Sequence, residues 1–248
     1  MRVTRVLVVQ PDETDPPARL GDWLADAGAD PVVLRPYAGD PVPDTLDGYR
    51  ALVCLGGVMG ALDDVAFPWL ADLRRLLSHA VAKRVPVLAV CLGAQLLAVA
   101  TGGQVRRGVN GSEIGLGLVA KRDVAKDDVL FAELPWTPDV LQFHQDEIAL
   151  LPPTAELLAS SPAYANQAFR VGPAAYGLQF HIETTADIVL DWVVRSPGLA
   201  ASVPPSRFDP ERLARGHEDI EEVWRPFVER FVRFASGAIT SRRELPLV

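Results

Sequence analysis

Short apolar runs rich in β-branched residues alternate with amphipathic segments along the first hundred residues. The apolar runs occupy positions 6–9, 32–34, 51–55 and 85–90. Continuous apolar runs of this length are typical of strands buried on both faces. Segments with apolar residues at helical spacing separate or follow them, at 16–27, 68–80 and 94–101. This alternation predicts an open, mostly parallel twisted sheet with helices on both faces, an α/β fold.

The pattern changes after position 104. Short runs at 114–119, 140–143, 156–159, 167–171 and 176–180 predict mostly strands and turns, and a helical pattern returns at 184–194. A proline-rich spacer then precedes a last helical segment, which begins at Asp209-Pro210-Glu211. We therefore predict one α/β domain over residues 1–196 and a helical C-terminal appendage over residues 197–248, packed on the same domain.

The appendage carries an apolar stripe that is too extensive to face water. Its members are Ile220, Val223, Trp224, Phe227, Phe231 and Phe234. Pro226 lies within this helical pattern and predicts a kink. The stripe could cover the chain's own sheet and helices. Alternatively, it could form a surface for a homodimer or for a separate partner subunit.

Composition and charge exclude several classes of protein. The chain has 248 residues, of which 24 are Lys or Arg and 32 are Asp or Glu, which gives a net charge of −8. This balance argues against a nucleic-acid binder that neutralises phosphates. Two cysteines are too few for a disulfide scaffold. No apolar run reaches 18 residues, so we expect no membrane span. The N-terminus lacks signal-peptide features, so we expect a cytoplasmic protein.

Cys91 is the first candidate for chemistry, because it stands between a buried strand and a helix. The sequence around it is Ala89-Val90-Cys91-Leu92-Gly93. Small residues two positions before and after a nucleophile permit the sharp turn that exposes its side chain. The N-terminus of a helix also favours the thiolate, the reactive form. The alternative is a buried cysteine of the core.

A cysteine nucleophile needs a base and a group that orients the base. The predicted strand at 176–180 is followed by His181-Ile182-Glu183. Residues i and i+2 of an extended segment share a face, so Glu183 can align the imidazole of His181. The carboxyl ends of parallel strands lie along one edge of a sheet, which could bring His181 to Cys91. The alternative is a surface histidine beside an incidental glutamate.

A hydrolase of this kind also needs donors for a developing oxyanion. The segment Gly56-Gly57-Val58-Met59-Gly60 follows the third strand, and glycines let backbone N–H groups approach a substrate closely. The N–H of Leu92, directly after the candidate nucleophile, would be a second donor. The alternative is an ordinary glycine-rich turn.

These segments together resemble class I, triad-type glutamine amidotransferases. Residues 89–98 are similar to the nucleophile segment of that family, and Gln179-Phe180-His181-Ile182-Glu183 is similar to its His-x-Glu signature. The glycine-rich segment at 56–59, Glu113-Ile114-Gly115 and His144-Gln145-Asp146 resemble stand-alone domains like the amidotransferase part of GMP synthase. The resemblance runs from about residue 7 to 194. It implies the flavodoxin-like class I glutamine amidotransferase fold.

The resemblance also implies residue roles. Cys91 would be the nucleophile, His181 the base and Glu183 its orienting group. Gly57 and Leu92 would form the oxyanion hole, and Gln95, Val58 and His144 would contact the substrate. Three positions depart from the family pattern, because Ala89, Ala94 and Ile182 replace the usual glycine, histidine and proline. These departures remove no catalytic group, but they weaken an assignment to GMP synthase itself.

We expect no cofactor and no metal. The four histidines, at 79, 144, 181 and 217, show no ligand spacing with either cysteine, and no phosphate-binding loop is present. The expected reaction is hydrolysis of the glutamine side-chain amide through a γ-glutamyl thioester, with ammonia passed to a separate synthase subunit. A γ-glutamyl peptide hydrolase that acts without a partner is the first alternative. A catalytically idle regulatory or binding module is the second.

Overall fold

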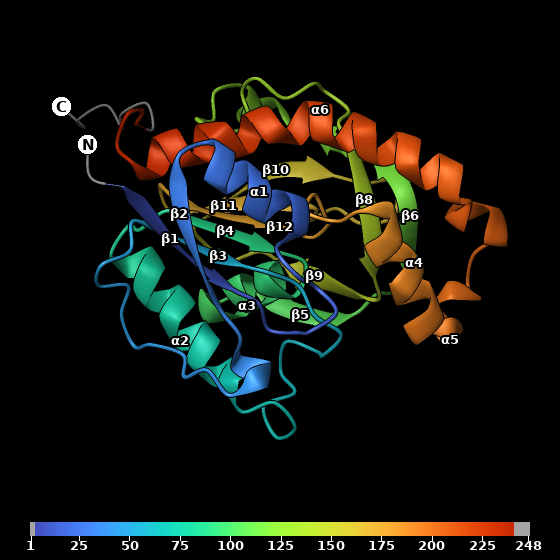
Figure 1. Ribbon diagram of the computed structural model, residues 1–248, viewed down its shortest axis with the longest axis horizontal. Coiled ribbons are helices and arrows are strands. Elements are labelled where there is room, and N and C mark those ends of the chain that lie inside the picture. The colour runs from blue at the N-terminus through green and yellow to red at the C-terminus, as the bar shows by residue number, and fades with distance from the viewer. Residues whose placement is uncertain (1–2, 241–248) are drawn as a thin grey trace.

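A twisted eight-stranded sheet forms the centre of the molecule in the computed structural model, which describes residues 3–240 (Figure 1). The sheet has the order β2-β1-β3-β4-β12-β11-β10-β7. Its strands are β1 (Thr4–Val9), β2 (Ala29–Leu34), β3 (Ala51–Cys54), β4 (Val87–Val90), β7 (Ala120–Lys121), β10 (Ala155–Ser160), β11 (Ala168–Val171) and β12 (Ala175–Leu178). Two further pairs lie outside it: β5 (Gln104–Arg107) with β9 (Asp146–Leu150), and β6 (Glu113–Leu118) with β8 (Asp139–His144).

The first five strands in this order are all parallel, as the apolar runs predict. The order 2-1-3-4 followed by one later strand is that of flavodoxin-like folds, in which ligands bind beyond the carboxyl ends of the strands. The remaining three strands extend the sheet in antiparallel fashion. The sheet is therefore mostly parallel with helices on both faces, and the predicted α/β fold class is confirmed.

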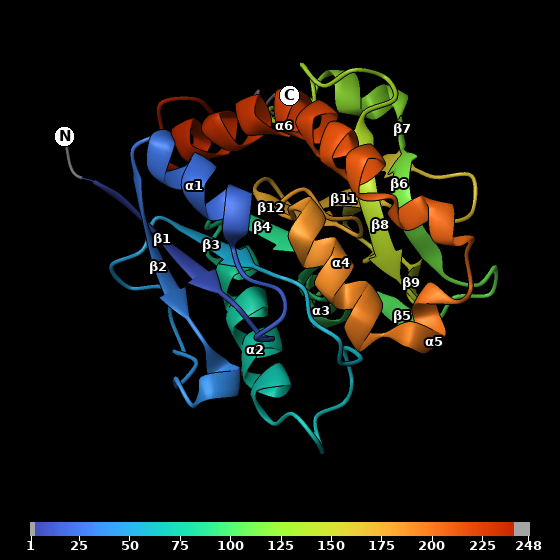
Figure 2. The same cartoon turned by 45° about the vertical axis from the view of Figure 1, so that its right-hand side comes forward.

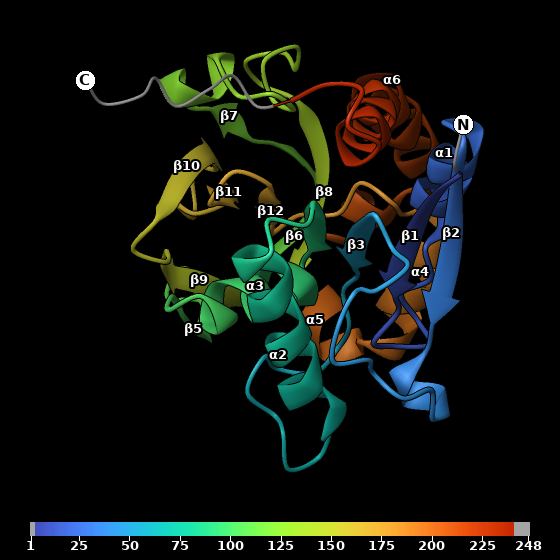
Figure 3. The same cartoon turned by 90° about the vertical axis from the view of Figure 1, so that its left-hand side faces the viewer.

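Alternation along the buried strands divides the core into two layers. Val6 and Val8 of β1 face one core cluster, whereas Leu7 and Val9 face the other. Helices α1 (Ala18–Asp26), α4 (Ala186–Arg195) and α6 (Pro210–Ala235) pack on the first side, and α2 (Trp69–Ala82) and α3 (Leu92–Ala100) on the second (Figure 3). A short helix, α5 (Pro197–Ala200), follows α4, and 3₁₀ turns occur at Pro36–Ala38, Asp123–Lys126 and Pro205–Phe208.

Three strands have no counterpart among the apolar runs of the sequence. They are β5, β7 and β9. Strand β5 reads Gln-Val-Arg-Arg and is mostly exposed, and β7 has only two residues. Edge and surface strands of this kind bury too few side chains to produce an apolar pattern.

Helix α6 spans 26 residues and curves over one face of the sheet (Figure 2). The Asp209 carboxylate caps its N-terminus by accepting a hydrogen bond from the N–H of Arg212 at 2.8 Å. Most of the apolar stripe is buried in the same core cluster as β1 and β3, with Val223 and Phe234 partly buried against it. The helix continues through Pro226, where we predicted a kink. Within the described residues, no helix has both the length and the apolar character needed to cross a membrane.

Candidate active site

Four segments meet beyond the carboxyl ends of the parallel strands. Asp15 lies in the loop after β1, Gly57 follows β3, Cys91 follows β4, and His181 follows β12. A cavity of about 400 Å³ opens at this edge and is lined by all four residues. This volume is within the range of small-molecule pockets.

Cys91 occupies a strained turn between β4 and α3. Its backbone has φ 49° and ψ −108°, in a region that side-chain-bearing residues rarely adopt. The strand end is fixed because the N–H of Cys91 donates to the carbonyl of Leu178 in β12 at 2.7 Å. Helix α3 then starts at once, at Leu92. A Cβ on Gly93 would lie 2.1 Å from the carbonyl oxygen of Cys54, so only glycine lets α3 begin this close to β3.

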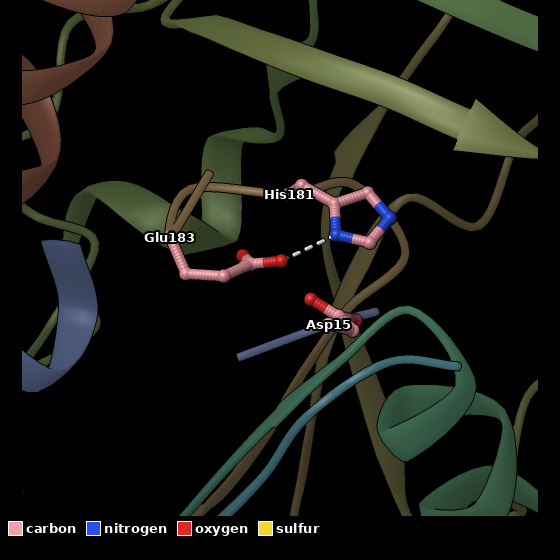
Figure 4. A group of neighbouring side chains, drawn as sticks. All are labelled: Asp15, His181 and Glu183. Atoms are coloured by element: carbon pink, nitrogen blue, oxygen red, sulfur yellow. Dashed lines mark hydrogen bonds and ion pairs between the residues drawn. The ribbon is translucent and has the colours of Figure 1, made fainter. Parts of the chain in front are cut away.

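His181 and Glu183 form a buried pair beside this turn (Figure 4). Nδ1 of His181 donates to Oε1 of Glu183 at 2.5 Å, and the other carboxylate oxygen accepts from the N–H of Ile182 at 2.9 Å. The backbone of His181 is tied to Leu141 of β8 by two hydrogen bonds, of 2.8 and 3.2 Å. Strand β8 therefore holds the backbone at His181, and Glu183 holds its imidazole.

The pair is electrostatically coupled. Burial alone would lower the pKa of the His181 imidazole, but Glu183 and the Cys91 thiol outweigh burial and raise this pKa well above its ordinary value. Burial alone would raise the pKa of Glu183, but His181 and the N–H of Ile182 hold this pKa below its ordinary value. The combination favours an imidazolium–carboxylate pair.

The other ring nitrogen of His181, Nε2, is buried and has no hydrogen-bond partner among the described residues. The Cys91 thiol helps to raise the pKa of the His181 imidazole, and Cys91 and His181 both line the cavity. An unpartnered buried nitrogen on the cavity wall is available to exchange a proton with a bound molecule or with Cys91.

The expected oxyanion donors are both next to Cys91 in space. A Cβ on Gly57 would lie 3.1 Å from Cδ2 of Leu92, so the two residues are in direct contact. Within residues 3–240, neither Gly57 nor Leu92 donates its backbone N–H to another protein group. The N–H of Val58, by contrast, donates to Oδ2 of Asp12 at 3.2 Å.

The three expected substrate contacts all line the cavity. The Val58 residue is 74% exposed at its rim. Gln95 is buried, and its amide donates to Oε1 of Gln179 at 3.2 Å. His144 is held by the protein on both sides: Nδ1 donates to the carbonyl of Asp146 at 2.9 Å, and Nε2 lies 3.2 Å from Oε2 of Glu113.

Sequence reasoning gave no role to three neighbours of the site. The amide of Gln179 lies 3.9 Å from Sγ of Cys91, and its i, i+2 relation to His181 is a signal that could have placed it. The Trp192 ring lies edge-on to His181, with centroids 4.8 Å apart. Asp15 lies against His181 and Glu183 (Figure 4). No sequence pattern marks Trp192 or Asp15, because Trp192 reaches the site from α4 and Asp15 from the loop after β1, both outside the recognised motifs.

Asp15, His181 and Glu183 each have an atom that could bind a metal ion, and these three atoms lie within 4.8 Å of one another. However, Nδ1 of His181 and Oε1 of Glu183 are only 2.5 Å apart. Metal ligands about 2.0–2.2 Å from an ion are normally farther from each other than this. The donor set in this arrangement therefore suits hydrogen bonding rather than metal coordination.

The fold and the position of the cavity define an α/β protein with its candidate site at the carboxyl edge of the sheet. The sequence model of the family "Glutamine amidotransferase class-I" matches residues 24–188. The chain belongs to the class I glutamine amidotransferase family, which confirms the resemblance inferred from its motifs.

Known relatives differ in activity. The chain is 30% identical over 175 residues to "Gamma-glutamyl peptidase 4" of Arabidopsis thaliana, and the match covers 69% of each protein. It is 28% identical over 180 residues to a GMP synthase (glutamine-hydrolyzing) of Christiangramia forsetii, covering 69% of this chain and 33% of that enzyme. Among solved structures, a glutamine amidotransferase from Thermotoga maritima has a TM-score of 0.82 at 31% identity, with 95% and 99% of the two chains covered.

Proposed function

We propose that the protein hydrolyses the side-chain amide of glutamine through a γ-glutamyl thioester on Cys91. The observation that carries this proposal is the turn at Cys91 on the wall of a cavity that is also lined by His181, whose Nδ1 is bonded to Glu183. Family membership supports it, because the family is defined by glutamine amidotransferases.

The proposed first step is attack of the Cys91 sulfur on the amide carbonyl carbon. The charge that develops on the carbonyl oxygen is stabilised by the N–H groups of Gly57 and Leu92, and one such donor typically contributes about 3 kcal/mol. Protonated His181 gives its Nε2 proton to the nitrogen of the leaving group, so the C–N bond breaks and ammonia departs. The enzyme is left as a thioester with neutral His181.

Water completes the proposed cycle. His181 takes a proton from water as the water oxygen attacks the thioester carbon. The C–S bond breaks, glutamate leaves, and Cys91 with protonated His181 is regenerated. Glu183 stabilises the imidazolium at both stages, because its carboxylate holds Nδ1 and compensates the positive charge.

The leaving group could be ammonia that is passed to a partner, or the amine of a peptide that is released. In the GMP synthase relative, the chain matches about a third of the enzyme, which supports transfer of ammonia to a separate synthase subunit. The match to a γ-glutamyl peptidase, with equal coverage of both proteins, supports the alternative of a γ-glutamyl peptide hydrolase that needs no partner. In that reaction, the leaving group is the amino group of a peptide rather than ammonia.

Product analysis tests the proposal and separates the two fates. Purified protein incubated with glutamine is expected to release glutamate and ammonia in equal amounts. A γ-glutamyl dipeptide used in parallel would release glutamate and a free amino acid. A higher kcat/KM for the dipeptide would favour the peptidase, and no turnover of either compound, above that of a Cys91→Ala control, would contradict the proposal and favour an idle module.

Replacing Glu183 by glutamine is expected to lower kcat by about 10²–10⁴-fold while KM changes little. The amide cannot stabilise the imidazolium that forms during proton transfer, an interaction that strengthens in the transition state. Steady-state kinetics measure both constants. Glu218→Gln on the exposed face of α6 is the matched control, and it should leave both constants unchanged. Equal kcat for the Glu183→Gln variant and wild type would mean that another group orients His181.

A further inference from the structure

Asp15 is a buried carboxyl group without a hydrogen-bond donor. The residue is 2% exposed, and neither of its carboxyl oxygens has a hydrogen-bond partner among the described residues. A buried carboxylate without donors is costly, because desolvation is not compensated. The neutral acid is far less costly, and it adds an O–H donor that needs an acceptor.

The surroundings of Asp15 offer one strong acceptor. Ligand atoms of Asp15, His181 and Glu183 lie within 4.8 Å of one another, so the second carboxyl group is directly beside the His181–Glu183 pair (Figure 4). Two carboxyl groups in one buried site do not both ionise, and one of them retains a proton. Glu183 already accepts from His181 and from the N–H of Ile182, so it carries the charge. Asp15 therefore carries the proton.

The electrostatic balance agrees with this assignment. Burial and the Glu183 charge raise the pKa of Asp15 well above its ordinary value, and the opposing effect of His181 is smaller. Asp12 raises the pKa of Asp15 further. The buried Cys54 thiol of β3 is also near, and burial and Asp15 raise the pKa of that thiol.

The fold holds Asp15 in this position from several sides. The indole N–H of Trp192 donates to the carbonyl of Thr14 at 2.7 Å, and the N–H of Arg19 donates to the carbonyl of Glu183 at 3.1 Å. The space for the carboxyl group depends on Gly56, because a Cβ there would lie 2.1 Å from Oδ2 of Asp15. A side chain at position 56 would therefore displace the acid from Glu183.

We propose that Asp15 is a positioning residue: as a neutral carboxylic acid, it donates a hydrogen bond to Glu183 and so holds the Glu183 carboxylate against Nδ1 of His181. What Asp15 supplies is a donor and not a negative charge. Its effect on turnover rests on the proposed hydrolysis by Cys91, whereas its effect on the His181–Glu183 hydrogen bond does not.

The test compares Asp15→Asn with Asp15→Leu and Asp15→Ala. Asparagine keeps a donor at nearly the same position, whereas leucine keeps the volume without a donor and alanine keeps neither. We expect the asparagine variant to retain at least about a third of the wild-type kcat. The leucine and alanine variants should lose about 100-fold in kcat with KM within about 2-fold, because the imidazole is misplaced but the substrate contacts persist. Asp22→Asn on the exposed side of α1 is the matched control.

A second readout needs no substrate. The proton on Nδ1 of His181, in a short bond to Glu183, should give a strongly downfield ¹H NMR signal in wild type. We expect the signal to persist in Asp15→Asn and to move upfield or disappear in whichever of the other two variants folds. If wild type and the three variants show this pattern of signals but wild type hydrolyses no glutamine, the positioning role would be supported and the proposed function contradicted.

Three results would overturn the positioning role. Loss of both kcat and the downfield signal in Asp15→Asn would mean that the negative charge is required. A raised KM in all variants at unchanged kcat would make Asp15 a substrate-binding group. Wild-type behaviour of Asp15→Leu would reduce Asp15 to a filler of space. If the leucine and alanine variants fail to fold, the asparagine variant still tests the proposal, because loss of kcat and of the downfield signal there would overturn it.

Discussion

Cys91→Ala is expected to abolish glutamine hydrolysis while the fold stays intact. Removal of the nucleophile from a triad that acts as a unit lowers kcat on the order of 10⁶-fold. The fold should survive, because the substitution removes only the sulfur atom, which lines the cavity and accepts a long 3.9 Å hydrogen bond from the Gln179 amide, whereas the backbone bond from the N–H of residue 91 to Leu178 is kept. Activity assays on glutamine, with circular dichroism to verify folding, measure both outcomes.

Cys54→Ala provides the control within the same chain. Cys54 lies in β3, and burial followed by the neighbouring Asp15 raises the pKa of its thiol to about 12, so it carries almost no thiolate at neutral pH. Its removal should leave hydrolysis nearly unchanged. Labelling of the native protein with an alkylating reagent, read by mass spectrometry, should modify Cys91 and spare Cys54. Preferential labelling of Cys54 would contradict the assignment of the nucleophile.

Deleting residues from 209 onward is expected to make the protein insoluble or to lower its melting temperature by more than about 10 °C. The deletion removes α6, whose buried side chains include Trp224, Phe227 and Phe231. Trp224 is fully buried, and its ring lies tilted against that of Phe180 with the centroids 5.3 Å apart. Its indole N–H donates to the carbonyl of Asp139. Without the helix, the part of this face of the sheet that α1 and α4 do not cover would be exposed to water.

The single substitution Trp224→Ala tests the same contribution in a full-length chain. It should cost about 3–5 kcal/mol in the free energy of unfolding, as expected when a large buried aromatic side chain is removed. Thermal or denaturant unfolding measures the change. Glu218→Ala, on the exposed face of the same helix, should differ little from wild type. If the truncated chain matched wild type in solubility, melting and activity, α6 would have to be an external surface rather than part of the core.

The parallel half of the sheet could be predicted because its strands are buried on both faces. Residues 51–54 are all buried, and so are 87–90, which gives each strand a continuous apolar run. Strand β5 has one partly buried residue among exposed ones, and its sequence contains the two arginines Arg106 and Arg107. Its pairing with β9 depends on the tertiary fold and leaves no periodic signal.

Some residues of the candidate site could likewise be predicted from local sequence, and others could not. Cys91 is marked by the small residues that flank it, and Glu183 by its spacing from His181, so local sequence was sufficient to propose both as candidates. Asp15 lies in the segment Pro11-Asp12-Glu13-Thr14-Asp15, which reads as a polar turn. The role proposed for Asp15 depends on its nearness to Glu183, which is 168 positions away, and single-sequence patterns carry no information on such contacts.

The late position of α6 in the chain has a consequence for biosynthesis. The last strand of the central sheet ends at Leu178, and α6 begins only at Pro210. Within it, His217 accepts a hydrogen bond from Thr184, the neighbour of Glu183, at 3.0 Å. Phe231 of α6 follows Leu178 by 53 residues, so at about 5–20 residues per second translation separates the two by roughly 3–11 s. During that interval, the part of the sheet that α6 covers is exposed in the nascent chain and Thr184 lacks its bond to His217, so we expect a ribosome-bound chain to expose apolar surface that chaperones recognise before it can become active.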